Sequence, residues 1–124
     1  MKNDIANLEI LLVEDNPINQ LLFSQLLEGE KAKVKIAENG KVAIEILESK
    51  KFDIIIMDIN MPIMNGYEAM KIIRSKAEFK DYKIIVITGS GNKKKCLKAG
   101  ADSYIAKPCL LEVIKTEILK LINS

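Results

Sequence analysis

The stretch that most constrains the fold is residues 54–58, I-I-I-M-D. Four consecutive apolar residues run directly into one acid, Asp58, and a proline follows at position 62. A short, wholly apolar run that ends at a structure breaker is typical of a strand buried on both faces of a parallel sheet. Asp58 is therefore expected at the carboxyl end of a central strand, which is the edge where open α/β sheets bind their ligands.

The rest of the chain alternates short apolar strands with amphipathic helical segments. Strands are predicted at residues 8–13, 33–37, 52–57, 83–88 and 102–106. Helices are predicted after Asn16-Pro17, Asn39-Gly40 and Asn65-Gly66, at residues 92–99, and after Lys107-Pro108. This alternation predicts one α/β domain over residues 1–124, a parallel sheet covered by helices on both faces through right-handed crossovers.

Each longer helical segment carries apolar residues at helical spacing, which predicts the face that packs on the sheet. These residues are Ile18, Leu21, Leu22 and Leu26 in the first helix, Val42, Ala43, Ile46 and Leu47 in the second, Ala69, Met70 and Ile73 in the third, and Leu110, Leu111, Ile114, Ile118 and Leu121 in the last. Cys96, in the short lysine-rich helix, is expected to be a small buried apolar residue.

Composition excludes several classes of function. The net charge is only +2, from 19 basic and 17 acidic residues, which is too balanced to favour nucleic-acid binding. No apolar run approaches the roughly 20 residues of a membrane span. The two cysteines form no disulfide framework and fit a reducing, cytoplasmic setting. The chain has no histidine, so serine–histidine and cysteine–histidine catalysis, histidine-bound metals and a self-supplied phosphohistidine are excluded.

Polar side chains end four of the five predicted strands. Glu14 and Asp15 follow the first, Asp58 the third, Thr88 ends the fourth and Lys107 follows the fifth. All strand ends of a parallel sheet point the same way, so these groups can converge on one crevice. With the second strand outside the first, the three acids would meet at the topological switch point of the sheet.

Three carboxylates at close range repel one another, by roughly 4 kcal/mol per close pair at an effective dielectric constant near 20. Such a cluster persists if it takes up protons, binds a cation or gains a lysine. Hard oxygen ligands with open positions suit Mg²⁺. An acid, a metal site, a lysine and a hydroxyl can together support phosphoryl transfer, with Asp58 as the nucleophile that forms an acyl phosphate and with Glu14 and Asp15 as metal ligands.

Each of these residues also has a purely structural interpretation. Glu14 and Asp15 could be acids favoured at a helix start, Thr88 could merely end a strand, and Lys107-Pro108 could be only a turn. Their joint placement at successive strand ends argues against that account.

The sequence resembles the response-regulator receiver domain of two-component signalling over essentially its whole length. The matching stretches are L-L-V-E-D-N-P-I-N-Q, M-D-I-N-M-P-I-M-N-G-Y-E-A-M, V-I-T-G-S and K-C-L-K-A-G-A-D-S-Y-I-A-K-P, in this order. The first two look most like receivers attached to hybrid sensor kinases. The resemblance implies a flavodoxin-like, doubly wound, five-stranded parallel sheet in the order 2-1-3-4-5, with five helices.

The resemblance also implies a phosphoacceptor switch. Asp58 would accept a phosphoryl group from the phosphohistidine of a sensor histidine kinase or a histidine phosphotransfer protein. Mg²⁺, for which Mn²⁺ can substitute, would be held by Glu14, Asp15, Asp58 and the backbone carbonyl of Asn60. Such a domain is no enzyme beyond catalysing its own aspartyl phosphorylation and dephosphorylation.

Further expectations from the resemblance concern the switch itself. Thr88 and Lys107 would bind the phosphoryl oxygens, Thr88 and Tyr104 would form the switch pair, and the Lys107–Pro108 peptide would be cis. The segment between Thr88 and Lys107 looks shorter than in typical receivers, so the fourth helix is expected to be short or displaced. In the family, that helix belongs to the output surface. The sequence does not identify the output partner. It also does not distinguish a stand-alone receiver from one cut from a longer protein.

Three other functions compete with this one. A hydrolase of the haloacid-dehalogenase type needs a second acid two residues after its nucleophile, and this chain has Asn60 there. A flavodoxin-like cofactor binder needs a first loop rich in Ser, Thr and Gly, whereas this loop is E-D-N-P-I-N. A receiver-like scaffold that is never phosphorylated would not need the full set of acids, hydroxyl and lysine.

Overall fold

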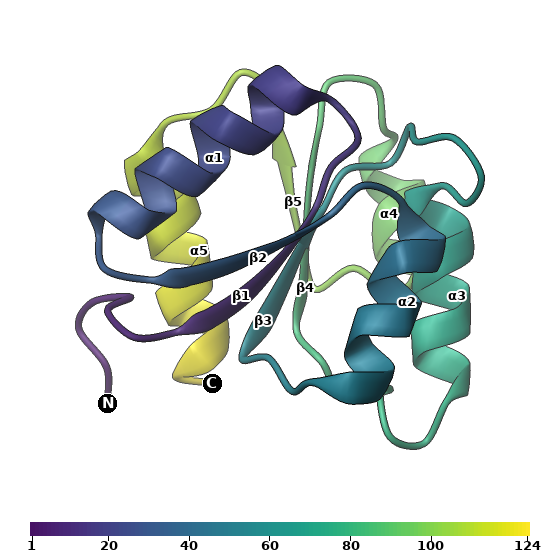
Figure 1. Ribbon diagram of the computed structural model, residues 1–124, viewed down its shortest axis with the longest axis horizontal. Coiled ribbons are helices and arrows are strands. Elements are labelled where there is room, and N and C mark those ends of the chain that lie inside the picture. Colours follow the sequence, from purple (N-terminus) through teal and green to yellow (C-terminus); the bar gives the residue numbers. More distant parts are fainter.

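Five strands and five helices alternate along the chain in the computed structural model, which describes all 124 residues (Figure 1). In order, the elements are β1 (Glu9–Val13), α1 (Pro17–Gly29), β2 (Lys33–Ala37), α2 (Gly40–Ser49), β3 (Ile54–Met57), α3 (Gly66–Ser75), β4 (Ile84–Thr88), α4 (Lys93–Ala99), β5 (Ser103–Ala106) and α5 (Leu111–Ile122). The strands form one sheet in the order β2-β1-β3-β4-β5, and every pair is parallel. The predicted fold class and strand order are confirmed.

The central strand β3 is buried on both faces, as its uninterrupted apolar sequence predicts. Helices α1 and α5 cover one face of the sheet, and α2, α3 and α4 cover the other (Figure 1). Ile54 and Ile56 belong to the core under α1 and α5, while Ile55 and Met57 belong to the core on the opposite face. Burying each of these side chains stabilises the fold by about 1.5–3 kcal/mol. This burial places Asp58 at the end of a central strand in which every residue is buried.

Asparagine side chains start four of the helices. Asn16 accepts hydrogen bonds from two backbone N–H groups of α1, and Asn39 and Asn92 each accept one from the first turn of α2 and α4. Asn65 forms a reciprocal capping box with Glu68 at the start of α3. Such caps contribute typically about 1 kcal/mol each. They confirm the helix starts expected at the Asn-Pro and Asn-Gly pairs.

The predicted core face of α1 is wrong. Ile18, Leu21 and Leu22 are 76%, 58% and 49% exposed, whereas Phe23 and Leu27 are buried. The helix is apolar on several sides, so helical spacing alone permits more than one orientation of its apolar stripe. Phe23 and Leu27 pack against the sheet, and this orientation of α1 leaves three large apolar side chains facing outward.

The other predicted helix faces agree more closely with the structure. All three predicted residues of α3 are buried, as are Ile114 and Ile118 of α5. In α2, Ile44 is buried, while the predicted Val42 and Ile46 are only partly so. The prediction that Leu110 lies on the core face of the last helix is wrong: it precedes α5 with an extended backbone and is 73% exposed.

Three smaller expectations are confirmed. Helix α4 has only seven residues, the fewest of the five helices. Cys96 is fully buried on its inner side. The Lys107–Pro108 peptide is cis. None of the helices has the length and apolar character needed to cross a membrane.

Arg74, near the end of α3, anchors the turns that precede β4 and β5. Its guanidinium donates five hydrogen bonds, to the backbone oxygens of Lys80, Tyr82 and, twice, Gly100, and to the carboxylate of Asp102. Gly100 has a φ of 126°, a conformation that side-chain-bearing residues rarely adopt, so the carbonyl can turn toward Arg74. One planar side chain therefore holds the turns before β4 and β5 against α3.

We expect Arg74→Lys to lower the free energy of unfolding by about 2–3 kcal/mol, because an ammonium cannot satisfy this planar set of acceptors. Urea denaturation monitored by circular dichroism would measure the change. Lys71→Ala, at an exposed position of the same helix, is the control and should cost less than about 0.5 kcal/mol. An Arg74→Lys variant as stable as this control would contradict the anchoring role.

Candidate functional site

The three predicted acids meet at the carboxyl edge of the sheet. Val13 pairs with Met57 in the β1–β3 register, so the residues that follow these two strands lie side by side. One carboxylate oxygen from each of Glu14, Asp15 and Asp58 lies within 4.8 Å of the others. Glu14 is buried, while Asp15 and Asp58 are partly accessible to solvent. The cluster thus has one enclosed acid and two that face the outside.

Lys107 joins the acids from the edge strand β5. Its Nζ atom donates hydrogen bonds to Glu14 Oε1 at 2.8 Å and to Asp58 Oδ2 at 3.0 Å. Burial alone would lower the pKa of Lys107, but the hydrogen bonds to these two carboxylates raise it above its ordinary value. The lysine therefore stays protonated at neutral pH and offsets part of the repulsion between the acids.

Glu14 is held in place by the first two turns of α1. Its Oε2 atom accepts a hydrogen bond from the Asn16 N–H at 3.1 Å, and its backbone oxygen accepts one from Gln20 Nε2 at 2.7 Å. Burial raises the pKa of Glu14 more than the hydrogen bond from Lys107 lowers it. Sequence reasoning missed Gln20, which is one of several polar residues in the predicted first helix.

The backbone around Asp58 is tightly packed. Asp58 Oδ1 accepts a hydrogen bond from the Ile59 N–H at 2.6 Å. A Cβ atom on Gly66 would lie 2.5 Å from the backbone oxygen of Asp58, so only glycine fits there. The Asn65-Gly66 pair looked like a helix start alone, and its close approach to Asp58 was missed.

The loops after β3 and β4 are connected across the site. The side chain of Asn60 donates a hydrogen bond to the Ser90 hydroxyl. This contact was also missed, because nothing in the sequence pairs two loop residues that lie 30 positions apart. It places a polar bridge beside the end of the strand that carries Asp58.

Thr88 and Tyr104, the expected switch pair, are connected through the backbone of Gly91. Thr88 is almost completely buried, and its hydroxyl accepts only a long bond, 3.4 Å, from the Ser90 N–H. The Tyr104 hydroxyl donates to the Gly91 oxygen at 3.0 Å. A Cβ on Gly91 would lie 2.5 Å from the methyl group of Thr88, so this loop packs directly on the threonine.

The donor set fits a hard divalent cation. Three carboxylates face one lysine, which leaves an excess of negative charge when all are ionised. Glu14 is buried, whereas Asp15 and Asp58 are the more accessible acids. Asp15 and Asp58 are therefore the best placed to bind Mg²⁺ directly, and Glu14 to support them.

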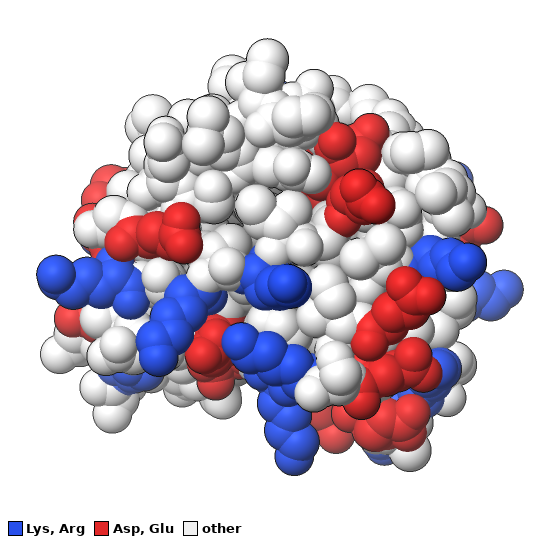
Figure 2. All heavy atoms as spheres, in the orientation of Figure 1, with Lys and Arg blue, Asp and Glu red and all other residues white.

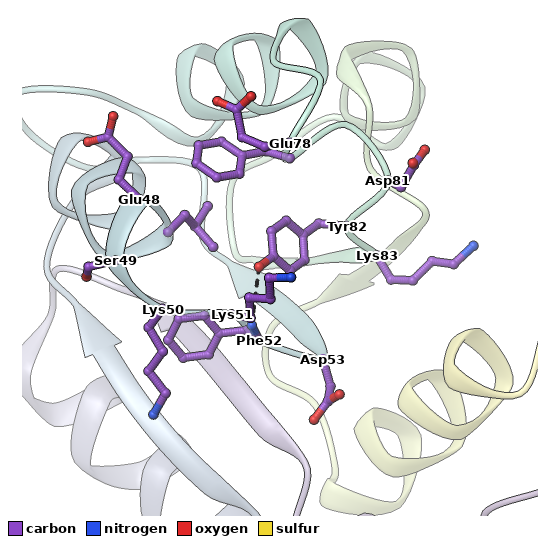
Figure 3. A pocket seen from close by; sticks show the side chains of 12 residues that line it. Glu48, Ser49, Lys50, Lys51, Phe52, Asp53, Glu78, Asp81, Tyr82 and Lys83 are labelled. Atoms are coloured by element: carbon purple, nitrogen blue, oxygen red, sulfur yellow. Dashed lines mark hydrogen bonds between the residues drawn. The ribbon is translucent and has the colours of Figure 1, made fainter.

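The largest hollow of the molecule lies at the opposite end of the sheet and is a poorer candidate (Figure 3). Its lining includes Phe52, Asp53, Tyr82 and Lys83, which flank the amino-terminal ends of β3 and β4. The Tyr82 hydroxyl accepts a hydrogen bond from the Phe52 N–H at 3.2 Å, drawn as a dashed line in Figure 3. The charged groups around it are of both signs and form no cluster of metal-ligating side chains.

Comparison with known proteins identifies a related family. The family model of the response regulator receiver domain matches residues 10–119. Hybrid signal transduction histidine kinase A of Dictyostelium discoideum is 36% identical over 117 residues, which cover 89% of this chain and 5% of that protein. Signal transduction histidine-protein kinase BarA of Escherichia coli K12 is 34% identical over 114 residues, or 90% of this chain and 12% of that protein. The chain thus spans only a small part of these curated relatives.

Solved structures with the same fold contain magnesium. The receiver domain of the sensor histidine kinase PA1611 from Pseudomonas aeruginosa, with magnesium coordinated in its active-site cleft, is 34% identical with a TM-score of 0.89, and the match covers 96% of this chain and all of that one. The response regulator TrrA of Thermotoga maritima, in complex with Mg²⁺ and BeF, is 34% identical with a TM-score of 0.82, covering 91% and 97% of the two chains.

We expect Mg²⁺ to stabilise the folded protein through the acid cluster. Free Mg²⁺ at about 100 times its Kd should add about 2.7 kcal/mol to the free energy of unfolding, since the unfolded chain has no site. Calorimetry with Mg²⁺ and with EDTA measures this increase. Asp15→Asn should remove most of it, while Asp81→Asn, at an exposed position near the other end of the sheet, should not. An equal gain in wild type and Asp15→Asn would contradict this site.

Proposed function

Since this chain belongs to the response regulator receiver domain family, we propose that it is the phosphoacceptor switch of a two-component phosphorelay. The observation that carries the proposal is the position of the Asp58 carboxylate, which ends the central strand 3.0 Å from the ammonium of Lys107 and beside two further acids. This arrangement supplies a nucleophile, a positive charge and metal ligands at one point, as phosphoryl transfer requires.

The proposed reaction uses Asp58 as the nucleophile. A carboxylate oxygen of Asp58 bonds to the phosphorus of a phosphohistidine, and the phosphorus–nitrogen bond breaks with its electron pair leaving on the imidazole. Asp15 and Asp58, with Glu14 and the backbone carbonyl of Asn60, would hold Mg²⁺ or Mn²⁺, which when bound neutralises charge on the phosphoryl oxygens. The only reactions catalysed would be the domain's own phosphorylation and dephosphorylation.

Thr88 and Lys107 are proposed to bind the phosphoryl oxygens. The Thr88 hydroxyl accepts only the long hydrogen bond from the Ser90 N–H. It would give up this bond to bind an oxygen of the new phosphoryl group. Because Gly91 packs on the Thr88 methyl group and binds the Tyr104 hydroxyl, movement of Thr88 would reach Tyr104 and the start of α4. Phosphorylation would thus shift a two-state equilibrium of this surface.

The phosphoryl donor must be another protein, because the chain has no histidine. We propose a sensor histidine kinase or a histidine phosphotransfer protein in the cytoplasm, where the free thiols Cys96 and Cys109 would stay reduced. The exposed Ile18, Leu21 and Leu22 offer this partner an apolar contact area on α1, the helix that follows Glu14 and Asp15. Figure 2 shows few charged side chains over this helix.

We expect acetyl phosphate to phosphorylate the protein once, in a reaction that requires Mg²⁺. Intact mass spectrometry under cold, mildly acidic conditions should show one added phosphoryl group. Asp58→Asn should abolish the adduct because it removes the nucleophile, and Asp81→Asn is the matched control that should retain it. An adduct that persists in Asp58→Asn would contradict this acceptor. If wild type shows none, failure to bind beryllofluoride would contradict the proposed function, whereas tight binding would indicate rapid hydrolysis.

We expect Thr88→Ala to uncouple Tyr104 from the phosphorylated state. Beryllofluoride should shift the NMR resonances of the Tyr104 ring and the α4 amides in wild type, and Thr88→Ala should lose most of this shift because the hydroxyl is absent. Thr88→Ser retains the hydroxyl but lacks the methyl group on which Gly91 packs, so it should restore the shift only in part. Identical shifts in wild type and Thr88→Ala would contradict the switch pair.

A further inference from the structure

Lys107 has a third contact that the phosphoacceptor chemistry does not use. Its Nζ atom lies 5.6 Å from the centroid of the Phe23 ring, in addition to its ion pairs with Glu14 and Asp58. This distance lies within the range of about 6 Å over which an aromatic face attracts a cation. Phe23 belongs to α1 and is only 6% exposed. The ammonium therefore lies between two carboxylates and a buried ring.

We propose that Phe23 is a positioning residue for phosphoryl transfer, one that holds the Lys107 ammonium beside Asp58; the inference rests on the proposed function. When Asp58 is phosphorylated, Lys107 must exchange its bond with the aspartate for one with a phosphoryl oxygen. The Glu14 and Phe23 contacts need not change during this exchange. Two fixed neighbours would therefore keep a flexible four-carbon side chain at the reacting group.

The arrangement of α1 supports this role. Gln20 and Phe23 lie three residues apart in α1, which places them on one helix face, and Asn16 is the N-cap residue just before the helix. The Asn16 N–H and the Gln20 side chain donate hydrogen bonds to Glu14, and Phe23 faces the ammonium that Glu14 binds. The start and the inner face of α1 thus contact both members of the Glu14–Lys107 ion pair. The opposite stripe is the exposed apolar face.

The alternative is that Phe23 only fills the core. It does belong to the buried cluster under α1 and α5, together with Leu27. A core role depends on the volume of the side chain, whereas attraction of a cation depends on the electron density of the ring face. Fluorination of the ring lowers that density and changes the volume little, so it separates the two roles.

Phe79 provides a matched control within the same chain. It is 5% exposed, and the Lys76 ammonium lies 5.7 Å from its ring centroid. Phe79 lines the hollow at the opposite end of the sheet, away from the acids. It therefore has the same burial and the same kind of cation contact but no connection with the site.

The experiment incorporates phenylalanine with one, two or three ring fluorines at position 23 or 79 of the full chain. Phosphorylation by acetyl phosphate is followed at saturating Mg²⁺, and Mg²⁺ affinity is measured separately by calorimetry. We expect the maximal rate to fall stepwise with fluorination at position 23, to about three- to ten-fold below wild type, since a desolvated cation contributes more to the contact. Mg²⁺ affinity should not change, and the series at position 79 should retain the wild-type rate.

Phe23→Leu should lower the rate by a similar factor, because it removes the ring face and keeps an apolar side chain. A flat rate along the series at position 23, or an equal fall at position 79, would overturn the proposal. So would a parallel loss of Mg²⁺ affinity, because that would indicate a general disturbance of the acids. Absence of phosphorylation and of beryllofluoride binding in wild type would instead contradict the proposed function itself.

Discussion

The ion pair of Lys107 with Glu14 and Asp58 is the interaction on which the site depends. The three carboxylates would otherwise repel one another, by roughly 4 kcal/mol per close pair at an effective dielectric constant near 20. The lysine reaches them from β5, at the edge of the sheet, because all parallel strands end on the same side. Two of the acids remain partly accessible, so the partial neutralisation leaves room for a cation.

The inner and outer faces of helix α1 make different contributions to the site. The Asn16 N–H at its start and Gln20 on its inner face bind Glu14, and Phe23 on the same face lies beside Lys107. Its outer face exposes the large apolar side chains of Ile18, Leu21 and Leu22. A partner that docks on this outer face would therefore contact the same helix that orients the ion pair. Gly91 has a comparable intermediate position between Thr88 and Tyr104 on the other side of the site.

Some of the site's residues have no local signal in the sequence. Gly66 is needed because helix α3 begins against the backbone of Asp58, and the same Asn-Gly pair would be equally suitable for an ordinary helix start. Gln20 is one of several polar residues on α1, and only the folded loop shows that it binds the Glu14 carbonyl. The contact between Asn60 and Ser90 joins two loops that no periodic pattern relates.

The sequence by itself determined the central strand, the asparagine helix starts and the acids at the strand ends, because burial, capping and turn formation depend on neighbouring residues. It also predicted the family through motifs in a fixed order. The tertiary structure alone decided which side of α1 faces the sheet, since Ile18 and Phe23 are both apolar and only packing distinguishes them. The strand ends predicted that Lys107 would lie at the same edge as the acids, but the tertiary structure decided its individual partners, which lie 49 and 93 positions away along the chain, and the nearby ring of Phe23. No local pattern encodes such contacts, because they arise only when the strands pair and the helices pack.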